Sequence, residues 1–292
     1  MSNTTLILLG AGSSSRFKTK TKKQWLYTGE IPLWLYVAEH FEKSAGFDQI
    51  IIVSTEDEIA HMKNFASYTY VMGGNNRQAS LTNALQKVTS EYVLVSDIAR
   101  CCVPSEMIER ILRAQGKGAC IVPVLPVVDT LYLENSPLAR EKVKVIQTPQ
   151  LSVTNMLKKA LDTDVIFTDD SSAIASLGEK VHFVEGSLEA HKLTTIDDLK
   201  KLSCLQTPSI KTLIGYGIDI HSFEENKEMF LCGVKIDESY GFKAHSDGDV
   251  AIHALIDALL GAAGMGDIGE LYPDTDETYA VADSKIMLEY TV

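Results

Sequence analysis

The first two-thirds of the chain alternate short apolar runs with amphipathic runs, and this alternation constrains the fold more than any other feature. The strand-like runs are TLILLGAG (5–12), QIIIVST (49–55), YTYVMGG (68–74), YVLVSDIA (92–99) and ACIVPVLPV (119–127). The runs with helical spacing between them cover residues 31–45, 57–66, 77–88 and 104–115. This pattern predicts an α/β fold with a doubly wound, mostly parallel sheet and helices on both faces. Ligands of such sheets bind beyond the carboxyl ends of the strands, so we expect the site there.

Two segments interrupt this rhythm and divide the chain. Residues 129–145, DTLYLENSPLAREKVKV, are predicted to form an extended arm or hairpin, which is often an element of dimer contacts. A second break, CLQTPSIKT (204–212), brings a proline and small polar residues after a helix. We place the domain boundary there, which gives a first domain of residues 1–206 and a smaller α+β domain of residues 212–292.

Charge and cysteine content narrow the class of function. The formal net charge of −12 argues against a nucleic-acid partner, because counterion release needs a cationic surface. Basic residues are concentrated in RFKTKTKK (16–23), so the chain could still bind a small anionic substrate there. Runs of this kind are more often solvated surface loops. Five cysteines without a C-x-x-C pair predict no disulfide framework and a cytoplasmic location. We find neither a signal peptide nor an apolar run of membrane-spanning length.

A glycine-rich turn follows the first strand. TLILL runs directly into GAGSSSR, where backbone N–H groups can approach phosphate oxygens. Alone the turn is a weak signal, since glycines after a strand are often plain turn residues. Arg16 and Lys23 strengthen the signal, because they follow the turn and can hold a triphosphate as fixed cations. GGNNR (73–77), SDIAR (96–100) and VVDT (127–130) follow the third, fourth and fifth strands and add polar groups at the same edge.

Several motifs stand in the order and spacing of one family: GAGSSSRF, KQ (23–24), GGNNRQAS, SDIARCCV, PVVDT, QTPQ (147–150), TDDSSA (168–173) and HKLTT (191–195). Over roughly residues 4–205 the chain resembles 2-C-methyl-D-erythritol 4-phosphate cytidylyltransferase of the non-mevalonate isoprenoid pathway. The resemblance implies a nucleotidyltransferase-like fold, CTP and methylerythritol phosphate as substrates, and Mg²⁺ as cofactor. The substrate phosphate would attack the α-phosphate of CTP, and pyrophosphate would leave. Such catalysis is mostly positioning and electrostatic stabilisation.

The same resemblance implies roles for individual residues. The residues expected to hold CTP are Gly12, Ser13, Arg16 and Lys23, the two cations stabilising charge on the attacked phosphate. Those expected to face cytosine and ribose are Gly74, Asn75 and Ser80. Asp97 would meet magnesium or the sugar alcohol, with Arg100 nearby. The residues expected to bind methylerythritol phosphate are Thr168, Lys192 and Arg140, the last from a dimer partner.

The second domain carries a lone histidine in an apolar helix. AHSDGDVAIHALIDALLG (244–261) predicts a helix that begins near Ser246 or Asp247 and carries His253. Asp249 and Asp257 lie one turn before and after this histidine, so either carboxylate could orient the imidazole. A histidine in such a helix is also compatible with a satisfied core residue.

Asp219 and His221 offer the partners that a metal would need. In GYGIDIHSF (215–223) the two residues are two apart on a predicted strand and therefore point to the same face. Together with His253 they form a His₂–carboxylate set appropriate for Zn²⁺. Either piece alone favours a surface strand or a satisfied core histidine, but the two pieces together, followed by GDIGELYPDTD (266–276), favour a zinc site.

From about Ile214 onward the chain is similar to 2-C-methyl-D-erythritol 2,4-cyclodiphosphate synthase, through HSDGDVAIHALIDALLGAAGMGDIG and GDIGELYPDTD (266–276). This resemblance implies a Zn²⁺ ion, with Mg²⁺ or Mn²⁺ as a second metal, that positions a cytidine diphospho-substrate for cyclisation and release of CMP. The residues expected near that substrate are His245, Ser246, Asp274 and Asp276. The similarity covers the amino-terminal half of such a domain, so we expect zinc affinity with poor or absent cyclase activity. Intact domains of this kind form trimers, and the two activities occur fused.

Two alternatives stay open from the sequence. A nucleotidyltransferase that activates a sugar phosphate shares the glycine-rich, basic first loop, although QTPQ and Lys192 weigh against it. The second domain could instead be an assembly module whose zinc only stabilises the fold or the oligomer. Structural zinc sites are usually closed and cysteine-rich, whereas the expected site has three ligands and room for a fourth.

Overall fold

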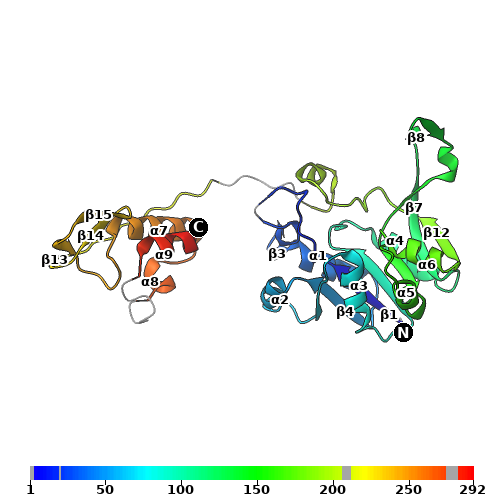
Figure 1. Cartoon of the computed structure of the whole chain (residues 1–292), viewed down its shortest axis with the longest axis horizontal. Helices are drawn as coiled ribbons and strands as arrows, with labels where there is room; N and C mark the ends of the chain where they lie inside the picture. The colour runs from blue at the N-terminus through cyan, green and yellow to red at the C-terminus, as the bar shows by residue number, and fades with distance from the viewer. Residues whose placement is uncertain (1–2, 20, 206–211, 274–281) are drawn as a thin grey trace. The chain divides into compact units, whose positions relative to one another are not determined.

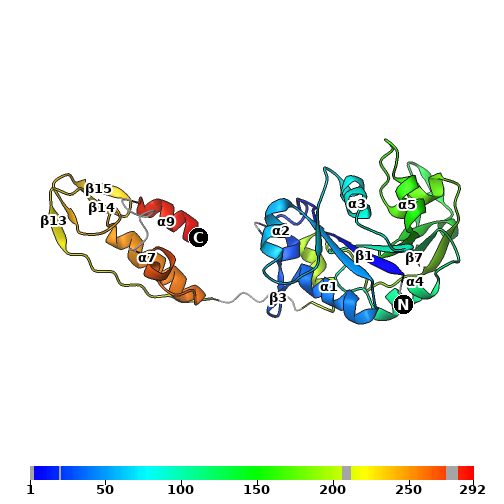
Figure 2. The same cartoon turned by 90° about the horizontal axis from the view of Figure 1, so that it is seen from below.

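The structure, a computed structural model, describes residues 3–19, 21–205, 212–273 and 282–292. The chain divides into two compact units, Met1–Thr207 and Pro208–Val292, which are described separately (Figures 1 and 2). Across the described ranges, every helix is too short or too polar to cross a membrane.

The first unit is built on one eight-stranded sheet. Its strand order is β10-β7-β11-β6-β1-β4-β5, with β12 also paired to β7. The five strands expected from the sequence are β1 (Thr4–Leu9), β4 (Gln49–Ser54), β5 (Thr69–Met72), β6 (Tyr92–Asp97) and β7 (Cys120–Pro126). β1 lies at the centre and pairs in parallel with both β4 and β6. The prediction of a mostly parallel sheet is confirmed.

Two antiparallel strands were not apparent from the alternation of runs. β11 (Gln150–Val153) lies antiparallel between β6 and β7, and β10 (Lys144–Ile146) pairs antiparallel with β7. Both are short and run in the same direction along β7, separated by residues 147–149. β12 (Val181–Glu185) returns to the parallel direction beside β7.

Helices cover both faces of this sheet, as predicted. Leu6 and Leu8 of β1 belong to one buried cluster, whereas Ile7 belongs to the other, because successive strand residues face opposite sides. The first cluster includes α1 (Leu33–Ser44) and α4 (Ser105–Arg113). The second includes α3 (Arg77–Leu85), α5 (Thr154–Ala160) and α6 (Asp170–Ser176). α2 (Glu56–Met62) follows β4 and buries Met62.

The expected arm is a hairpin that stands out from the body of the first unit (Figure 1). β8 (Leu131–Leu133) pairs antiparallel with β9 (Ser136–Leu138), and a 3₁₀ turn, η2 (Arg140–Lys142), follows. The remaining short elements are η1 (Lys23–Trp25), β2 (Tyr27–Thr28), β3 (Ile31–Pro32) and η3 (Ile196–Lys201). η3 begins with a capping box in which Thr195 and Asp198 satisfy each other's backbone N–H groups.

The described residues of the second unit form two antiparallel strand pairs and three helices. The pairs are β13 (Phe223–Glu225) with β16 (Tyr240–Phe242), and β14 (Met229–Leu231) with β15 (Val234–Asp237). The helices are α7 (Val250–Ala263), α8 (Ile268–Leu271) and α9 (Ser284–Thr291). Its small core consists of Ile252, Ile256, Leu260, Tyr272 and Met287.

Two sequence predictions about this unit need correction. Residues 215–222 are extended but form no strand, because Gly215 and Gly217 press the backbone against α7 instead of a neighbouring strand. A Cβ atom on Gly217 would lie 2.0 Å from the Ala254 carbonyl oxygen, so only glycine permits this approach. α7 begins at Val250 with Asp249 as its N-cap, three residues later than the expected start.

Candidate functional site

A cavity of about 540 Å³ lies at the carboxyl ends of β1 and β6. Its lining includes the predicted residues Gly12, Ser13, Arg16, Lys23, Gly74, Asn75, Ser80, Asp97 and Lys192. Parallel strands end at the same edge of the sheet, so loops distant in sequence meet there. The structure therefore brings together most of the residues expected to act on the nucleotide.

The glycine-rich loop is held in place by a buried glutamine. Gln24 donates from Nε2 to the Gly10 carbonyl at 3.2 Å and to Glu58 at 2.9 Å. Ser14, which has a positive φ of 54°, donates to the other side of the same amide. Burial alone would raise the pKa of Glu58, but hydrogen bonds from Ser54 and Trp25 lower it. A carboxylate and an amide thus hold the glycine-rich loop in place beside the cavity.

Lys23 is a half-buried cation on the same loop. Its Nζ donates to the Leu193 carbonyl at 3.2 Å, which ties it to the segment that carries Lys192. Burial and the charge of Lys192 lower the pKa of Lys23, although Asp97 acts in the opposite direction. Arg16 is exposed at the mouth of the cavity. Two cations thus line the same cavity.

Asp97 ends β6 and is almost fully buried between cations. Its Oδ2 lies 2.8 Å from Lys192 Nζ and accepts from Thr148 Oγ1 at 3.4 Å. Its Oδ1 lies 3.9 Å from Nε of Arg77. Burial would raise the pKa of Asp97, but Lys192 and Arg77 overcome this effect and lower it. The carboxylate is therefore ionised and has a defined orientation.

Gly74 and Ser80 connect the loop that follows β5 to α3. The Gly74 N–H donates to Ser80 Oγ at 3.0 Å, and Asn76 caps α3 through the Ala79 N–H at 2.8 Å. A Cβ on Gly73 would lie 2.4 Å from that of Ala11, so the two loops are in direct contact. Asn75 lines the cavity between them.

Arg100 lies on a neighbouring cavity of about 360 Å³ that shares Lys192 and Thr194 with the first. Its Nε donates to Thr148 Oγ1 at 2.8 Å, and its Nη1 donates to the Ala190 carbonyl at 2.5 Å. Sequence reasoning quoted QTPQ but gave Thr148 no role. Its place is visible only when β11 is paired beside β6.

Arg140 and Thr168 do not line either of these cavities. Arg140 lies on the arm, where its Nη1 donates to the Val128 carbonyl at 2.6 Å. Thr168 lies in the loop just before α6. Within one protomer, these two residues therefore do not lie with the other predicted substrate-binding residues.

The second unit brings Asp219, His221 and His253 together. Asp219 Oδ2 lies 2.7 Å from His221 Nε2 and 3.1 Å from His253 Nδ1, and the two nitrogens are 3.3 Å apart. The Lys243 carbonyl lies 3.0 Å from His221 Nδ1, and because a carbonyl only accepts, a hydrogen bond here would use a proton on Nδ1 and leave Nε2 available to a cation. Two imidazoles and a carboxylate that converge in this way fit a zinc-type cation.

The groups that orient His253 differ from the prediction. Its Nε2 faces the hydroxyls of Ser284 at 2.9 Å and Ser246 at 3.2 Å. Asp249 instead caps α7 and accepts from the N–H groups of residues 232 and 233, and Asp257 accepts from the residue 268 N–H. Both carboxylates are occupied by backbone donors, which is why neither reaches the imidazole.

The other residues expected near the second substrate are only partly described. Ser246 contacts His253, and His245 is exposed beside it. Asp274 and Asp276 lie outside the described residues.

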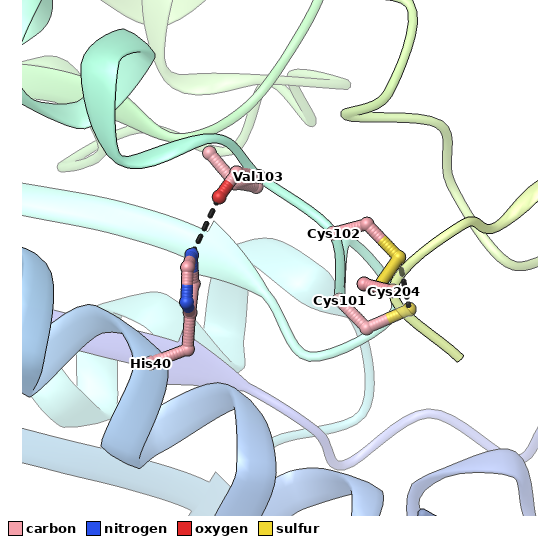
Figure 3. The surroundings of a disulfide bond; sticks show 5 residues. All are labelled: His40, Cys101, Cys102, Val103 and Cys204. Atoms are coloured by element: carbon pink, nitrogen blue, oxygen red, sulfur yellow. Dashed lines mark hydrogen bonds between the residues drawn. A yellow bond between two sulfur atoms is a disulfide. The ribbon is translucent and has the colours of Figure 1, made fainter. Parts of the chain in front are cut away.

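The structure pairs Cys102 with Cys204 in a disulfide (Figure 3), so the prediction of no disulfide is wrong. The two residues are 102 positions apart, and their Cα atoms lie 5.4 Å apart, a separation suited to the bond. The thiol of Cys101 is free and lies 3.9 Å from the Cys102 sulfur. The pairing arises because residues 190–205 return to the loop that follows β6, a proximity that cysteine counting cannot show.

The fold and the two sites define a class: a nucleotidyltransferase-like α/β unit joined to a unit in which two histidines and an aspartate converge as a candidate metal site. Residues 4–205 match the 2-C-methyl-D-erythritol 4-phosphate cytidylyltransferase (IspD) family, and residues 212–292 match the YgbB family. A protein of Sulfurovum sp. named bifunctional enzyme IspD/IspF is 70% identical over 292 residues, which is 100% of this chain and 78% of that protein. A protein of the same name from Sulfurimonas denitrificans is 56% identical, over 97% of this chain and 74% of its own length. The chain belongs to the bifunctional IspD/IspF family.

Solved structures agree with this assignment. The bifunctional IspDF from Campylobacter jejuni superposes with a TM-score of 0.78 at 49% identity, over 99% of this chain and 78% of that one. The 2-C-methyl-D-erythritol 4-phosphate cytidylyltransferase from Thermus thermophilus gives a TM-score of 0.54 at 27% identity, over 67% and 95% of the two chains. The chain is thus a bifunctional enzyme, a cytidylyltransferase fused to a cyclodiphosphate synthase that the YgbB match covers in part. Both resemblances inferred from the sequence are confirmed.

Proposed function

We propose that the cavity of the first unit binds CTP across the glycine-rich loop, with methylerythritol phosphate entering beside Lys192. One observation carries this proposal: Arg16, Lys23 and Lys192 surround a cavity in which Asp97 is the sole carboxylate among the lining residues. Such a surface favours a ligand with several negative charges. Backbone N–H groups at Gly12 and Ser13 supply further contacts of the kind that phosphates use.

The geometry supports an in-line transfer that needs no general base. The acceptor phosphate is itself the nucleophile, so its attack on the α-phosphate requires charge stabilisation rather than proton removal. In this proposal Arg16 and Lys23 stabilise the charge that develops on the attacked phosphate and on the leaving pyrophosphate. The tie between Lys23 and Leu193 couples the cation to the acceptor side of the cavity.

Further roles are assigned by position. Gly74, Asn75 and Ser80 would face the cytosine and ribose from the start of α3. Asp97 would meet either the sugar alcohol or Mg²⁺, for which a buried, ionised carboxylate is a suitable ligand. Mg²⁺, when bound, would neutralise charge on the phosphates. Arg100 would bound the acceptor side from the neighbouring cavity.

Arg140 enters this scheme only through a second protomer. We propose a dimer in which the arm of one protomer brings Arg140 to the acceptor phosphate of the other, with Thr168 adding a hydroxyl. Complementation tests this directly: Lys23→Ala and Arg140→Ala chains, each nearly inactive alone, should regain transferase activity when mixed. Activity that stays at the level of the separate variants would place Arg140 outside the partner's site.

For the second unit we propose that Asp219, His221 and His253 hold Zn²⁺, with His245 and Ser246 near the substrate phosphates. The support is the convergence of three ligand atoms and a carbonyl oxygen beside His221 Nδ1, which favours the tautomer with Nε2 free for the ion. Zn²⁺, when bound, would polarise a phosphate oxygen. A trimer through this unit, a second Mg²⁺ or Mn²⁺ ion, and roles for Asp274 and Asp276 are further predictions. A cytoplasmic location also stays a prediction, and the Cys102–Cys204 disulfide removes the cysteine argument for it.

Phosphorus NMR tests both assignments in one sample. The purified chain with CTP, methylerythritol phosphate and Mg²⁺ should release pyrophosphate. The same sample, supplied with the phosphorylated cytidine diphospho-intermediate and Zn²⁺, tests the second assignment through the release of CMP. Absence of pyrophosphate would overturn the first assignment, and a screen of other sugar phosphates and nucleotides would follow.

A further inference from the structure

Arg77, which lines the transferase cavity, forms an ion pair with the buried Asp170, and the roles given above leave this pair unused. Arg77 is the first residue of α3, and its Nη1 donates to Oδ1 of Asp170 at 2.8 Å. Asp170 is the first residue of α6 and is completely buried. The residues are 93 positions apart, so the sheet brings the two helix starts together.

This pair is poorly suited to stabilising the fold. Oδ2 of Asp170 and Nη2 of Arg77 are both buried and have no hydrogen-bond partner within the described ranges. Burial raises the pKa of Asp170, and the charge of Arg77 only partly opposes this effect. Apolar side chains of similar size often stabilise such a position as well or better. The pair is therefore better explained by what it positions.

Arg77 faces the carboxylate at the centre of the cavity. Its Nε lies 3.9 Å from Oδ1 of Asp97, whereas Oδ2 of Asp97 contacts Lys192 at 2.8 Å. The two oxygens thus meet two different cations. Without Arg77, Asp97 could turn both oxygens to Lys192 and compensate the lysine charge that a phosphate would otherwise meet. Without Asp170, the long Arg77 side chain would lose the contact that fixes it.

We propose that Arg77 and Asp170 are positioning residues of the transferase: Asp170 fixes Arg77, and Arg77 fixes the orientation of Asp97 for the acceptor step. The inference rests on the proposed acceptor-side role of Asp97. It predicts that the pair acts on catalysis through Asp97 and therefore has no separate effect once that carboxylate is removed.

A double-mutant cycle measures this coupling. Asp170→Asn keeps the shape of the side chain and removes its charge. We expect it to lower kcat/KM for methylerythritol phosphate about 10- to 100-fold, as for loss of a hydrogen bond to a charged group. KM for CTP should change by less than about 3-fold. In an Asp97→Asn background the same substitution should lower kcat/KM by less than about 3-fold.

Two further variants keep the test sharp. Ser172→Ala, on the same turn of α6, removes an exposed hydroxyl that contacts Asp169, and its kinetics should match the parent enzyme. Arg77→Lys keeps the charge but lacks the fork that can face two carboxylates, so it should lose less activity than Arg77→Ala and show the same dependence on Asp97. If Asp170→Asn does not fold, Arg77→Lys completes the cycle.

The outcomes separate this inference from the function it rests on. Equal losses with and without Asp97, or equal rises of KM for both substrates, would show that the pair only supports the fold. If Asp97→Asn alone left acceptor kinetics unchanged, the proposed role of Asp97 would fail, and the inference would fall with it.

Discussion

The two units prepare for charged ligands in opposite ways. In the first, Arg16, Lys23 and Lys192 are spaced around a cavity of about 540 Å³. In the second, oxygen and nitrogen atoms of Asp219, His221 and His253 converge to within 3.3 Å of one another. Separated cations suit an extended polyanion, whereas converging donors suit a single metal ion. The spacing of the polar groups, more than their number, distinguishes the two sites.

The units also differ in what stabilises them. The first has a buried cluster on each face of its sheet and a disulfide near its end. Within its described residues the second has five buried hydrophobic residues, while Ile214, Tyr216, Ile218 and Ile220 are exposed along one extended segment. We therefore expect an ion that binds the converging ligand atoms to raise the stability of the second unit.

The largest expected effect comes from a substitution in the cavity of the first unit that leaves the site of the second unit intact. Lys23→Ala should reduce cytidylyl transfer about 10²- to 10³-fold, because it removes a fixed cation from the attacked phosphate. Zinc content should be unchanged. Pyrophosphate release and metal analysis on one preparation measure both, and a loss below about 3-fold would remove Lys23 from the chemistry.

The converse substitution is His253→Ala. Zinc content should fall at least about 10-fold, because two ligands cannot hold the ion as three do, while transfer stays at the parental rate. His245→Ala is the matched control, since it removes an exposed imidazole that is no part of the cluster. Unchanged zinc in the His253 variant would refute the ligand assignment.

Loss of the Cys102–Cys204 disulfide should lower the stability of the first unit and leave that of the second unchanged. Cys204→Ser should lower the free energy of unfolding of the first unit by about 2–4 kcal/mol, since the disulfide closes a long loop. Denaturant unfolding with and without reductant measures the loss, and Cys232→Ser, an exposed thiol of the second unit, serves as control. Titration of five free thiols in the unreduced chain would contradict the pairing.

The smallest expected effect is a shift in pH dependence. The cationic form of Lys23 is the acid form, and its pKa is lowered by burial and by Lys192. The cation is lost as pH rises through that lowered pKa, so kcat/KM for CTP should decline with rising pH. The midpoint of the decline should lie below about 10.4, the ordinary pKa of lysine. Lys23→Arg should abolish this decline. If the dependence of kcat/KM on pH were unchanged in Lys23→Arg, the decline at high pH would belong to another titrating group.

Much of this organisation is predictable from the sequence, for a physical reason. Parallel strands end on one edge, so the alternation of runs places Arg16, Lys23 and Asp97 near one another. Pairs chosen by tertiary contact are not predictable in this way, and Arg77 with Asp170 is one of them. Local patterns cannot show that two segments far apart in the chain will meet.

The incorrect sequence predictions likewise concern contacts between residues that lie far apart in the chain. The Cys102–Cys204 pair was missed because counting and spacing carry no information about proximity at long range. Asp249 lies at the right helical spacing from His253, but backbone N–H groups at the start of α7 take its carboxylate first. Ser284, which does reach the imidazole, comes from a different helix.

The central claim is that cytidylyl transfer in the cavity of the first unit does not depend on a metal ion bound by Asp219, His221 and His253 in the second unit. Dialysis against a chelator that removes zinc, followed by Mg²⁺ alone, tests it on the unmodified chain, with zinc content and pyrophosphate release measured on each aliquot. The account predicts that zinc falls from about one ion per chain to none while the rate of pyrophosphate release with CTP and methylerythritol phosphate is unchanged. A rate that falls in proportion to zinc and returns when zinc is restored would contradict it.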